Sequence, residues 1–179
     1  MTPASSTLDA AGGTVTMTVS MSGDASEVLN SYDLFFDISG VDLNDTATTS
    51  PVTLSNFQSL TAPGFGDLFD SINPGGGGRD FGVSNADLTG DTLGLTGGQN
   101  LFSFDATFAA NATATDVVYN FAFTPAVNGF EVQINGAAFD VGTITYNNAA
   151  VTVSAVPEPS SMGLAALAIG AVALRRRRV

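Results

Sequence analysis

The sequence of 179 residues contains no cysteine, no histidine and no tryptophan, and all five of its basic residues are arginines. Without cysteine or histidine the chain cannot build a disulfide framework, a Ser-His-Asp or Cys-His nucleophile system, a histidine-based metal site or a zinc–thiolate site. Without lysine it cannot form a Schiff base, a Walker-type phosphate site or a lysine isopeptide crosslink. Stability therefore has to come from packing, and no cofactor is expected.

Basic charge is scarce outside the C-terminal tail. Up to Val156 the chain has 16 acidic residues and a single basic one, Arg79, which gives a net charge of −15; the tail brings the total to −12. Because phosphate binding requires clustered lysine or arginine, this composition excludes nucleic acid as a partner. A mean hydropathy of +0.26 argues against a disordered chain. About 155 residues before the tail are enough for one domain with its own core.

Alternating apolar and polar residues dominate the region between the first dozen residues and the tail. Residues 1–13 are small and polar and are expected to be a leader or a remnant linker. Residues 14–155 are expected to form one passenger domain. The alternation predicts strands over residues 14–21, 31–39, 52–57, 101–109, 117–124, 130–134, 141–146 and 150–155. Short strands separated by turn signals predict an all-β fold, an antiparallel β-sandwich of the jelly-roll type, with the thirteen phenylalanines as its core.

Two stretches are predicted from their turn residues. Residues 60–98 are rich in glycine and proline, which indicates a long loop region with a short strand near residues 80–84. The dipeptide Asn135-Gly136 is typical of a tight hairpin turn.

Acidic loops leave a calcium site open. Calcium requires hard oxygen ligands, and Asp42, Asn44 and Asp45 supply three such side chains within one loop. The segment does not match an EF-hand loop, which needs more ligands and a terminal glutamate. The alternative is a solvated acidic loop without a metal, and this alternative is preferred.

Catalysis and sugar binding have weak support. A pair of carboxyl groups could hydrolyse glycosides, but 17 acidic residues make accidental pairs inevitable, so we expect a protein that is not an enzyme. Saccharide binding commonly uses exposed aromatic rings. The three tyrosines lie within strand patterns, whereas four phenylalanines lie off the clear inward faces and form either a surface patch or a cover over the core: Phe35, Phe57, Phe65 and Phe69.

The last two dozen residues, 156–179, differ from everything before them. Pro157-Glu158-Pro159 is followed by an apolar run from Met162 to Leu174 and then by four consecutive arginines, 175–178. We expect a transmembrane helix over residues 161–174. The apolar run 162–174, thirteen residues, would span about 20 Å as a helix against a hydrocarbon core of about 30 Å, so snorkelling and local thinning have to absorb the mismatch. The arginine cluster then orients the precursor in the inner membrane with Arg175, Arg176, Arg177 and Arg178 on the cytoplasmic side.

This tail resembles the PEP-CTERM sorting signal in the order, spacing and terminal position of its parts: Pro157, Glu158 and Pro159, a short hydrophobic helix, and the arginine cluster. The resemblance covers about 24 residues. It implies that a membrane-embedded exosortase recognises and removes the tail as the protein passes to the cell surface or extracellular matrix of a bacterium. The first residues show no basic and apolar signal peptide, so we expect either a start codon placed too far downstream or a signal peptide left out of this chain.

The passenger domain is similar in pattern to the cohesin-like and carbohydrate-binding-module-like sandwiches of bacterial surfaces, as in the alternating stretch 31–39. We therefore expect an exported, non-catalytic β-sandwich with a structural or adhesive role. The alternative is a carbohydrate-binding or cohesin-like recognition module, with extracellular polysaccharide as a candidate partner.

Overall fold

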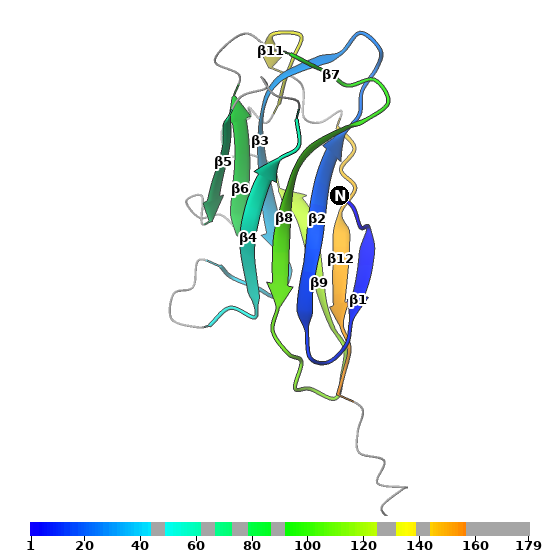
Figure 1. Ribbon diagram of the computed structural model, residues 1–179, viewed down its shortest axis with the longest axis vertical. Coiled ribbons are helices and arrows are strands. Elements are labelled where there is room, and N and C mark those ends of the chain that lie inside the picture. The colour runs from blue at the N-terminus through cyan, green and yellow to red at the C-terminus, as the bar shows by residue number, and fades with distance from the viewer. Residues whose placement is uncertain are drawn as a thin grey trace, which may run out of the picture.

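Two β-sheets pack face to face in an elongated sandwich (Figure 1). The computed structural model describes residues 1–43, 49–61, 67–72, 79–86, 92–124, 132–138 and 144–156, of which 67–72 and 86 are described by their backbone alone. The described part is all-β, which confirms the predicted fold class. The expected C-terminal helix, 161–174, lies outside the described residues.

Sheet A is the smaller sheet and has three antiparallel strands. Its order is β2 (Gly13–Met21), β8 (Gln99–Phe108) and β4 (Val52–Ser59). Thr14 stands opposite Thr107, which in turn stands opposite Thr53. In this register the inward-facing residues of the three strands lie next to one another. Because residues alternate along each strand, the sheet has one apolar and one polar face.

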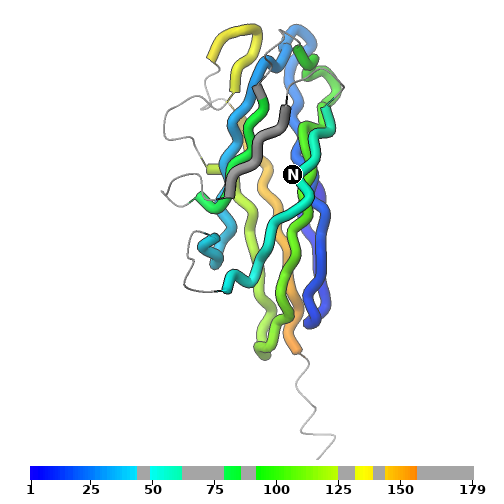
Figure 2. Tube along the Cα trace, turned by 60° about the vertical axis from the view of Figure 1, so that its left-hand side comes forward, coloured from blue at the N-terminus to red at the C-terminus, as the bar shows by residue number. Residues whose placement is uncertain are grey.

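Sheet B has nine strands and is organised around the long strand β3 (Val28–Ile38). One path through it runs β1 (Ser5–Leu8), β12 (Ala149–Val153), β9 (Val117–Thr124), β3, β10 (Val132–Ile134) and β11 (Ala137–Ala138). On another path β6 (Phe81–Ala86) joins β3 to β5 (Asp67–Ile72), and β7 (Leu93–Gly94) pairs with the start of β3. Figure 2 shows the orange strand β12 between β9 and the blue N-terminal strands.

Aromatic rings from both sheets meet in the centre of the sandwich. The Phe36 and Phe81 rings of sheet B stack with centroids 4.5 Å apart, and Phe81 meets Phe104 of sheet A edge to face at 5.1 Å. Phe104 also contacts Phe57 and Phe121. The predicted phenylalanine core is thus confirmed at six buried positions: 36, 81, 102, 104, 108 and 121.

The N-terminal segment is part of the sheet. Residues 1–13, which the sequence places before the passenger domain, contain β1, and Ser5–Leu8 pair in parallel with residues 150–153 of β12. Thr2 additionally pairs with Thr18 of β2. Four residues of modest alternation carry little sequence signal, and the pairing partner lies about 145 residues away along the chain, so only the tertiary structure reveals this strand.

Three further sequence predictions have mixed outcomes. The hairpin at Asn135-Gly136 is confirmed: both residues have positive φ, 54° and 74°, and they join β10 to β11. The short strand near residues 80–84 is confirmed as β6. The strand predicted over 141–146 is wrong for Ile144–Tyr146, which belong to no strand.

Candidate functional site

Asp80 is the most deeply buried carboxylate among the described residues, at 2% exposure. Its Oδ2 accepts a hydrogen bond from the Ile38 backbone N–H at 2.6 Å, and its Oδ1 accepts one from the Leu43 N–H at 2.9 Å. The Asp80 N–H donates to the Phe36 carbonyl oxygen. Asp80 therefore fastens the chain where it leaves β3, and both carboxylate oxygens are engaged in that task.

Asp37 lies beside this buried carboxylate. Burial raises the pKa of Asp37, and the charge of Asp80 and a side-chain hydrogen bond to Asp80 raise it further. Two carboxyl groups that share one site cannot both ionise freely. We call Asp37, Arg79 and Asp80 the Asp80 corner.

Arg79, the single basic residue before the tail, is also buried, at 7% exposure. Its guanidinium carbon lies 4.6 Å from the centroid of the Phe35 ring, in reach of a cation–π contact. On neighbouring β6, a Cβ added at Gly82 would come within 2.7 Å of Phe35 Cδ1, so the ring lies over the bare glycine backbone. Phe35, one of the phenylalanines considered for a surface patch, is thus half-buried against its own sheet.

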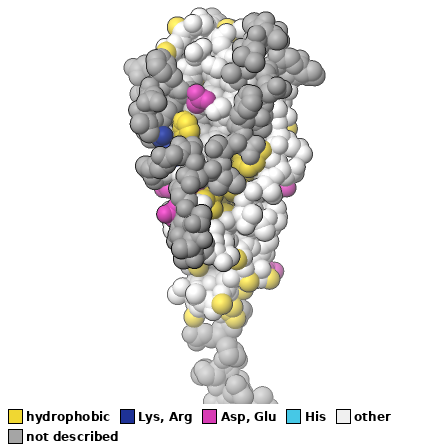
Figure 3. All heavy atoms as spheres, turned by 90° about the vertical axis from the view of Figure 1, so that its left-hand side faces the viewer, with side chains coloured by type: hydrophobic (Ala, Val, Ile, Leu, Met, Phe, Trp, Pro, Cys, Tyr) yellow, Lys and Arg dark blue, Asp and Glu magenta, His cyan; other side chains and the backbone are white. Residues whose placement is uncertain are grey.

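The described structure does not test the predicted calcium ligands Asp42, Asn44 and Asp45. Asp42 is exposed, whereas Asn44 and Asp45 lie outside the described residues. Within the described ranges no three acidic side chains gather into a group that could hold a metal ion. On the face shown in Figure 3, the acidic side chains are scattered singly. The calcium site at residues 42–45 stays a prediction.

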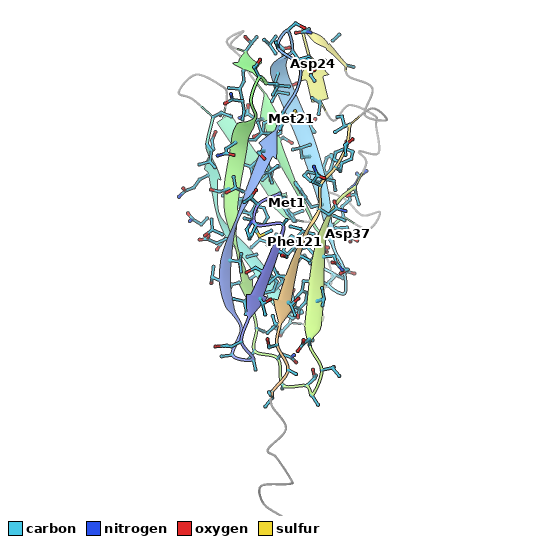
Figure 4. The ribbon with its side chains drawn as sticks, turned by 90° about the vertical axis from the view of Figure 1, so that its right-hand side faces the viewer. Met1, Met21, Asp24, Asp37 and Phe121 are labelled. Atoms are coloured by element: carbon cyan, nitrogen blue, oxygen red, sulfur yellow. The ribbon has the colours of Figure 1, made fainter. Side chains whose placement is uncertain are left out.

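A cleft of about 860 Å³ opens between the two sheets on the side of β2. Its floor consists of buried Leu34, Leu95 and Leu101. One wall is the end of β2, residues 19–22, and the other is the segment 144–147 that leads into β12. Figure 4 looks onto this side, with Asp24 and Met21 above Met1. We call this the β2 cleft.

Carboxylates stand at the upper rim of the β2 cleft. Glu27 Oε2 accepts a hydrogen bond from the Asp24 backbone N–H at 2.6 Å, which closes the turn between β2 and β3. Both side chains line the cleft. The volume is within the range of small-molecule sites, but much of the wall is strand edge and glycine backbone rather than apolar side chain.

The outer face of sheet A is covered with hydroxyl groups. Thr14 and Thr107 hydroxyls are 2.9 Å apart across the strands. Asp105 accepts hydrogen bonds from the Thr16 hydroxyl at 2.7 Å and from Asn56 Nδ2 at 3.0 Å, and these two bonds lower the pKa of Asp105. This face therefore presents neutral, already hydrogen-bonded groups and one ionised carboxylate.

The sandwich ends in a hydrogen-bonded junction just before the tail. Buried Asn111 donates through Nδ2 to the carbonyl oxygens of Val153 and Ser154. The Val156 N–H donates to the Thr113 carbonyl oxygen. No helix long and apolar enough to cross a membrane occurs in the described part of the chain, which stops at residue 156. Pro157, Glu158, Pro159 and the arginines 175–178 lie outside it.

The tail matches a known sorting signal. The family model of the PEP-CTERM protein-sorting motif matches residues 155–178, which confirms the resemblance seen in the sequence. The chain is therefore a sorted, exported protein. No curated protein matches the sequence.

Solved structures of cohesin modules resemble the sandwich. The third ScaC cohesin of Acetivibrio cellulolyticus, solved in complex with a ScaB dockerin, has a TM-score of 0.56 at 11% identity, over 85% of this chain and 95% of that one. A cohesin from a Clostridium thermocellum OlpC cohesin–dockerin complex has a TM-score of 0.55 at 11% identity, over 85% and 90%. A type III cohesin of the ScaE cell-surface anchoring scaffoldin of Ruminococcus flavefaciens has 0.53 at 16%, over 84% and 83%.

Sequence reasoning did not find the Asp80 corner or the β2 cleft. Asp80 follows an arginine and four glycines and looks like an ordinary loop residue. The one usable signal was charge: Arg79 is the sole cation in 156 residues and stands next to an acid. The cleft has no sequence signal, because it arises where seven separate parts of the chain meet: 1–2, 19–27, 34, 95–101, 123, 134 and 144–147. The fold resembles that of cohesin modules, and the tail matches the PEP-CTERM protein-sorting motif.

Proposed function

We propose that this protein is an exported, non-catalytic recognition module with an adhesive or structural role at the cell surface or in the extracellular matrix. An exosortase-type membrane enzyme removes the tail near Pro157, Glu158 and Pro159. Before cleavage the apolar segment 161–174 anchors the precursor in the inner membrane, with the arginines 175–178 on the cytoplasmic side. Residues 156–179 thus act as a separate sorting tail behind the sandwich.

One combination of observations carries this proposal: a sorting motif follows directly on a sandwich of the cohesin fold. The last strand, β12, ends at Val153, and Val156 is exposed. The processing motif begins at the next residue, where a protease needs accessible chain. The scaffoldin cohesin among the similar structures belongs to a cell-surface anchoring protein, which agrees with surface delivery.

Three of the described carboxylates have structural partners, and this supports a non-catalytic role. Asp80 binds two backbone amides, Asp105 binds Thr16 and Asn56, and Asp116 accepts a hydrogen bond from the Ala155 N–H. An acid and a base held at catalytic spacing in a cleft would be needed for glycoside hydrolysis.

Protein recognition is favoured over sugar binding by the aromatic side chains. None of the described phenylalanines and tyrosines is exposed, so the described surface lacks the stacking platform that saccharides commonly require. Two of the similar cohesins were solved bound to dockerins. A matrix polysaccharide remains the second candidate partner, which the hydroxyl face of sheet A would contact.

The sorting half of the proposal is tested by expressing the full gene in its own host and measuring location and intact mass. We expect material outside the cell that has lost the residues after about position 156. A double substitution Pro157→Ala and Pro159→Ala should leave full-length precursor in the membrane fraction. Pro51→Ala, a matched change within the sandwich, should be processed normally. Full-length protein in the cytoplasm would overturn the proposal.

The recognition half is tested with the processed protein purified from its host. Labelled protein should bind saturably to host cells that lack the gene, and unlabelled protein should compete. Protease treatment of the cells should abolish binding if the partner is a protein, whereas periodate treatment should abolish it if the partner is a polysaccharide. Binding that neither saturates nor competes would contradict a recognition role.

A further inference from the structure

The loop between β8 and β9, residues 109–116, bonds to the chain that leaves β12. Buried Asn111 donates through Nδ2 to the carbonyl oxygens of Val153 and Ser154, at 3.2 and 3.1 Å. The Ser154 N–H in turn donates to the Leu8 carbonyl oxygen at 3.0 Å. The end of β12 is therefore fixed by two other parts of the chain, this loop and the end of β1.

The same loop also holds the next two residues. Asp116 Oδ1 accepts a hydrogen bond from the Ala155 N–H at 2.7 Å, and the Thr113 carbonyl oxygen accepts one from the Val156 N–H at 3.1 Å. A carboxylate acceptor makes the bond to Ala155 stronger than a bond between neutral groups. Figure 1 shows the end of the described chain at the lower end of the sandwich. We call this set of contacts the tail clamp: Asn111, Thr113 and Asp116 against residues 153–156.

The spacer between the tail clamp and the proposed anchor is short. The clamp ends at Val156 and the proposed anchor begins at residue 161, so residues 157–160 connect them. The chain from 156 to 161 spans at most about 18 Å when fully extended. The processing motif, 157–159, lies within this spacer, and release of residues from the clamp would lengthen the spacer.

Hydrogen-bonded main chain resists proteolysis. A protease has to bind the backbone on both sides of the bond that it cuts, so groups bonded within a folded domain must first be released. Cleavage of such a bond is limited to the population of molecules that is locally open. Each of residues 153–156 has a main-chain bond to another part of the sandwich. The folded sandwich therefore protects the chain up to Val156.

We propose that the tail clamp sets the limit of tail processing. The exosortase-type enzyme cuts after Val156 and before residue 161, and residues 153–156 stay in the mature protein as part of the sandwich. The step is a peptide hydrolysis: the C–N bond breaks, and water supplies the hydroxyl of the new carboxyl group and a proton of the new amine. The inference rests on the proposed removal of the tail and adds that the folded domain fixes its limit.

Two side chains of the clamp have a positioning role in this reaction. Asn111 and Asp116 act through the main chain of residues 153–156 and not on the bond that is cut. A positioning role predicts that loss of a clamp contact changes the C-terminal residue of the product. A purely structural role would change the Tm alone.

The first test does not depend on the exosortase. The material is the full-length chain with Pro157→Ala and Pro159→Ala, purified in detergent from a host without the enzyme, so that proline does not slow digestion. Proteinase K should remove the tail and stop at the clamp. Mass spectrometry of the C-terminal peptide should place the end of the resistant core at Val156 or a residue or two beyond. A core that ends before Val156 would overturn the inference.

Variants of two exposed carboxylates sharpen this test. Asp116→Ala removes the acceptor of the Ala155 N–H and should raise the fraction of cores that end before Val156 about tenfold. Asp116→Asn keeps a side-chain oxygen as acceptor and should restore the limit. The matched control is Asp9→Ala, because Asp9 Oδ1 accepts from the Ala11 N–H at 2.8 Å within its own turn. Equal trimming in Asp116→Ala and Asp9→Ala would contradict the role of the clamp.

The second test uses the processing enzyme of the host. The parent chain and Asp9→Ala should give a mature form whose last residue lies between 156 and 160, whereas Asp116→Ala should give additional ends before 156. An unchanged C-terminus in Asp116→Ala would show that the motif alone selects the bond, and would overturn the inference. Full-length protein in the cytoplasm would instead overturn the proposed function itself, which a processed chain that ends before Val156 would not.

Discussion

The pKa values of acidic residues are shifted in opposite directions on the outer face of sheet A and at the Asp80 corner of sheet B. Asp105 on sheet A lies in the open, and hydrogen bonds from Thr16 and Asn56 lower its pKa. Asp37 on sheet B is partly buried beside Asp80, and burial together with that neighbour raises its pKa. Hydrogen-bond donors thus stabilise the charged form of Asp105, whereas burial and the neighbouring Asp80 destabilise the charged form of Asp37.

The two sheets differ in where their polar side chains lie and in what those side chains bind. Sheet A forms a neutral hydroxyl surface in which the single acid is part of a side-chain network. Sheet B instead uses buried polar groups, Asp80 and Asn111, to fix the chain where strands end. Buried polar groups are stabilising only when their hydrogen bonds are complete. The corners of sheet B should therefore be more sensitive to substitution than the face of sheet A.

The largest loss of stability is expected from a substitution in the core that both sheets share. Phe104 of β8 is fully buried and its ring contacts those of Phe57, Phe81 and Phe121. Phe104→Ala should lower the free energy of unfolding by about 3–5 kcal/mol, because lost burial and a cavity both contribute. Urea denaturation of the mature protein measures this. Thr107→Ala on the exposed face of the same strand is the control and should change stability by less than about 0.5 kcal/mol.

A smaller loss is expected at the lower corner of sheet B. Asn111 donates to three carbonyl oxygens, and its Oδ1 accepts from the Thr113 N–H and hydroxyl. Asn111→Ala removes a donor from the buried carbonyl oxygen of Val153 and from the part-buried one of Ser154, and should cost about 1–3 kcal/mol in unfolding free energy. Exposed Asn100 of β8 gives the matched variant, Asn100→Ala. Equal losses of unfolding free energy in the two variants would contradict the expectation that the corners of sheet B are more sensitive to substitution than the face of sheet A.

The smallest effects concern pH and should have opposite signs on the two sheets. Because the pKa of Asp37 is raised above its ordinary value of 3.8, its contribution to stability is present below that value and is lost as pH rises through the folded pKa. Because the pKa of Asp105 is lowered, its contribution is present above the ordinary value and is lost as pH falls through the folded pKa.

Replacing each acid by its amide separates the two cases. Asp37→Asn should raise stability at about pH 7 by less than about 1 kcal/mol, since the group is largely solvated and screened. Asp105→Asn should lower stability at the same pH and leave it unchanged at strongly acidic pH. Urea midpoints of the two variants and the parent chain across the pH range check both signs. A loss of stability in Asp37→Asn at neutral pH would show that the Asp37–Asp80 contact is attractive.

Alternation made most of the sandwich predictable. Strands β2, β3, β4, β8 and β9 contain stretches that alternate inward and outward, and the predicted ranges overlap most of each strand. Short strands were harder, because β1 has four residues and takes its stability from β12 at the other end of the chain. Ile144–Tyr146 alternate but belong to no strand, and segment 144–147 lines the β2 cleft.

The sequence by itself determined that this is an exported all-β protein without thiol, imidazole or lysine chemistry, because composition and a contiguous terminal motif need no folding to be read. The tertiary structure alone decided the rest. Asp80 is buried because β6 lies against the end of β3. The β2 cleft forms where the end of β2, the buried leucines 34, 95 and 101, and segment 144–147 come together. Contacts between residues far apart in the chain depend on strand pairing, which no local pattern specifies.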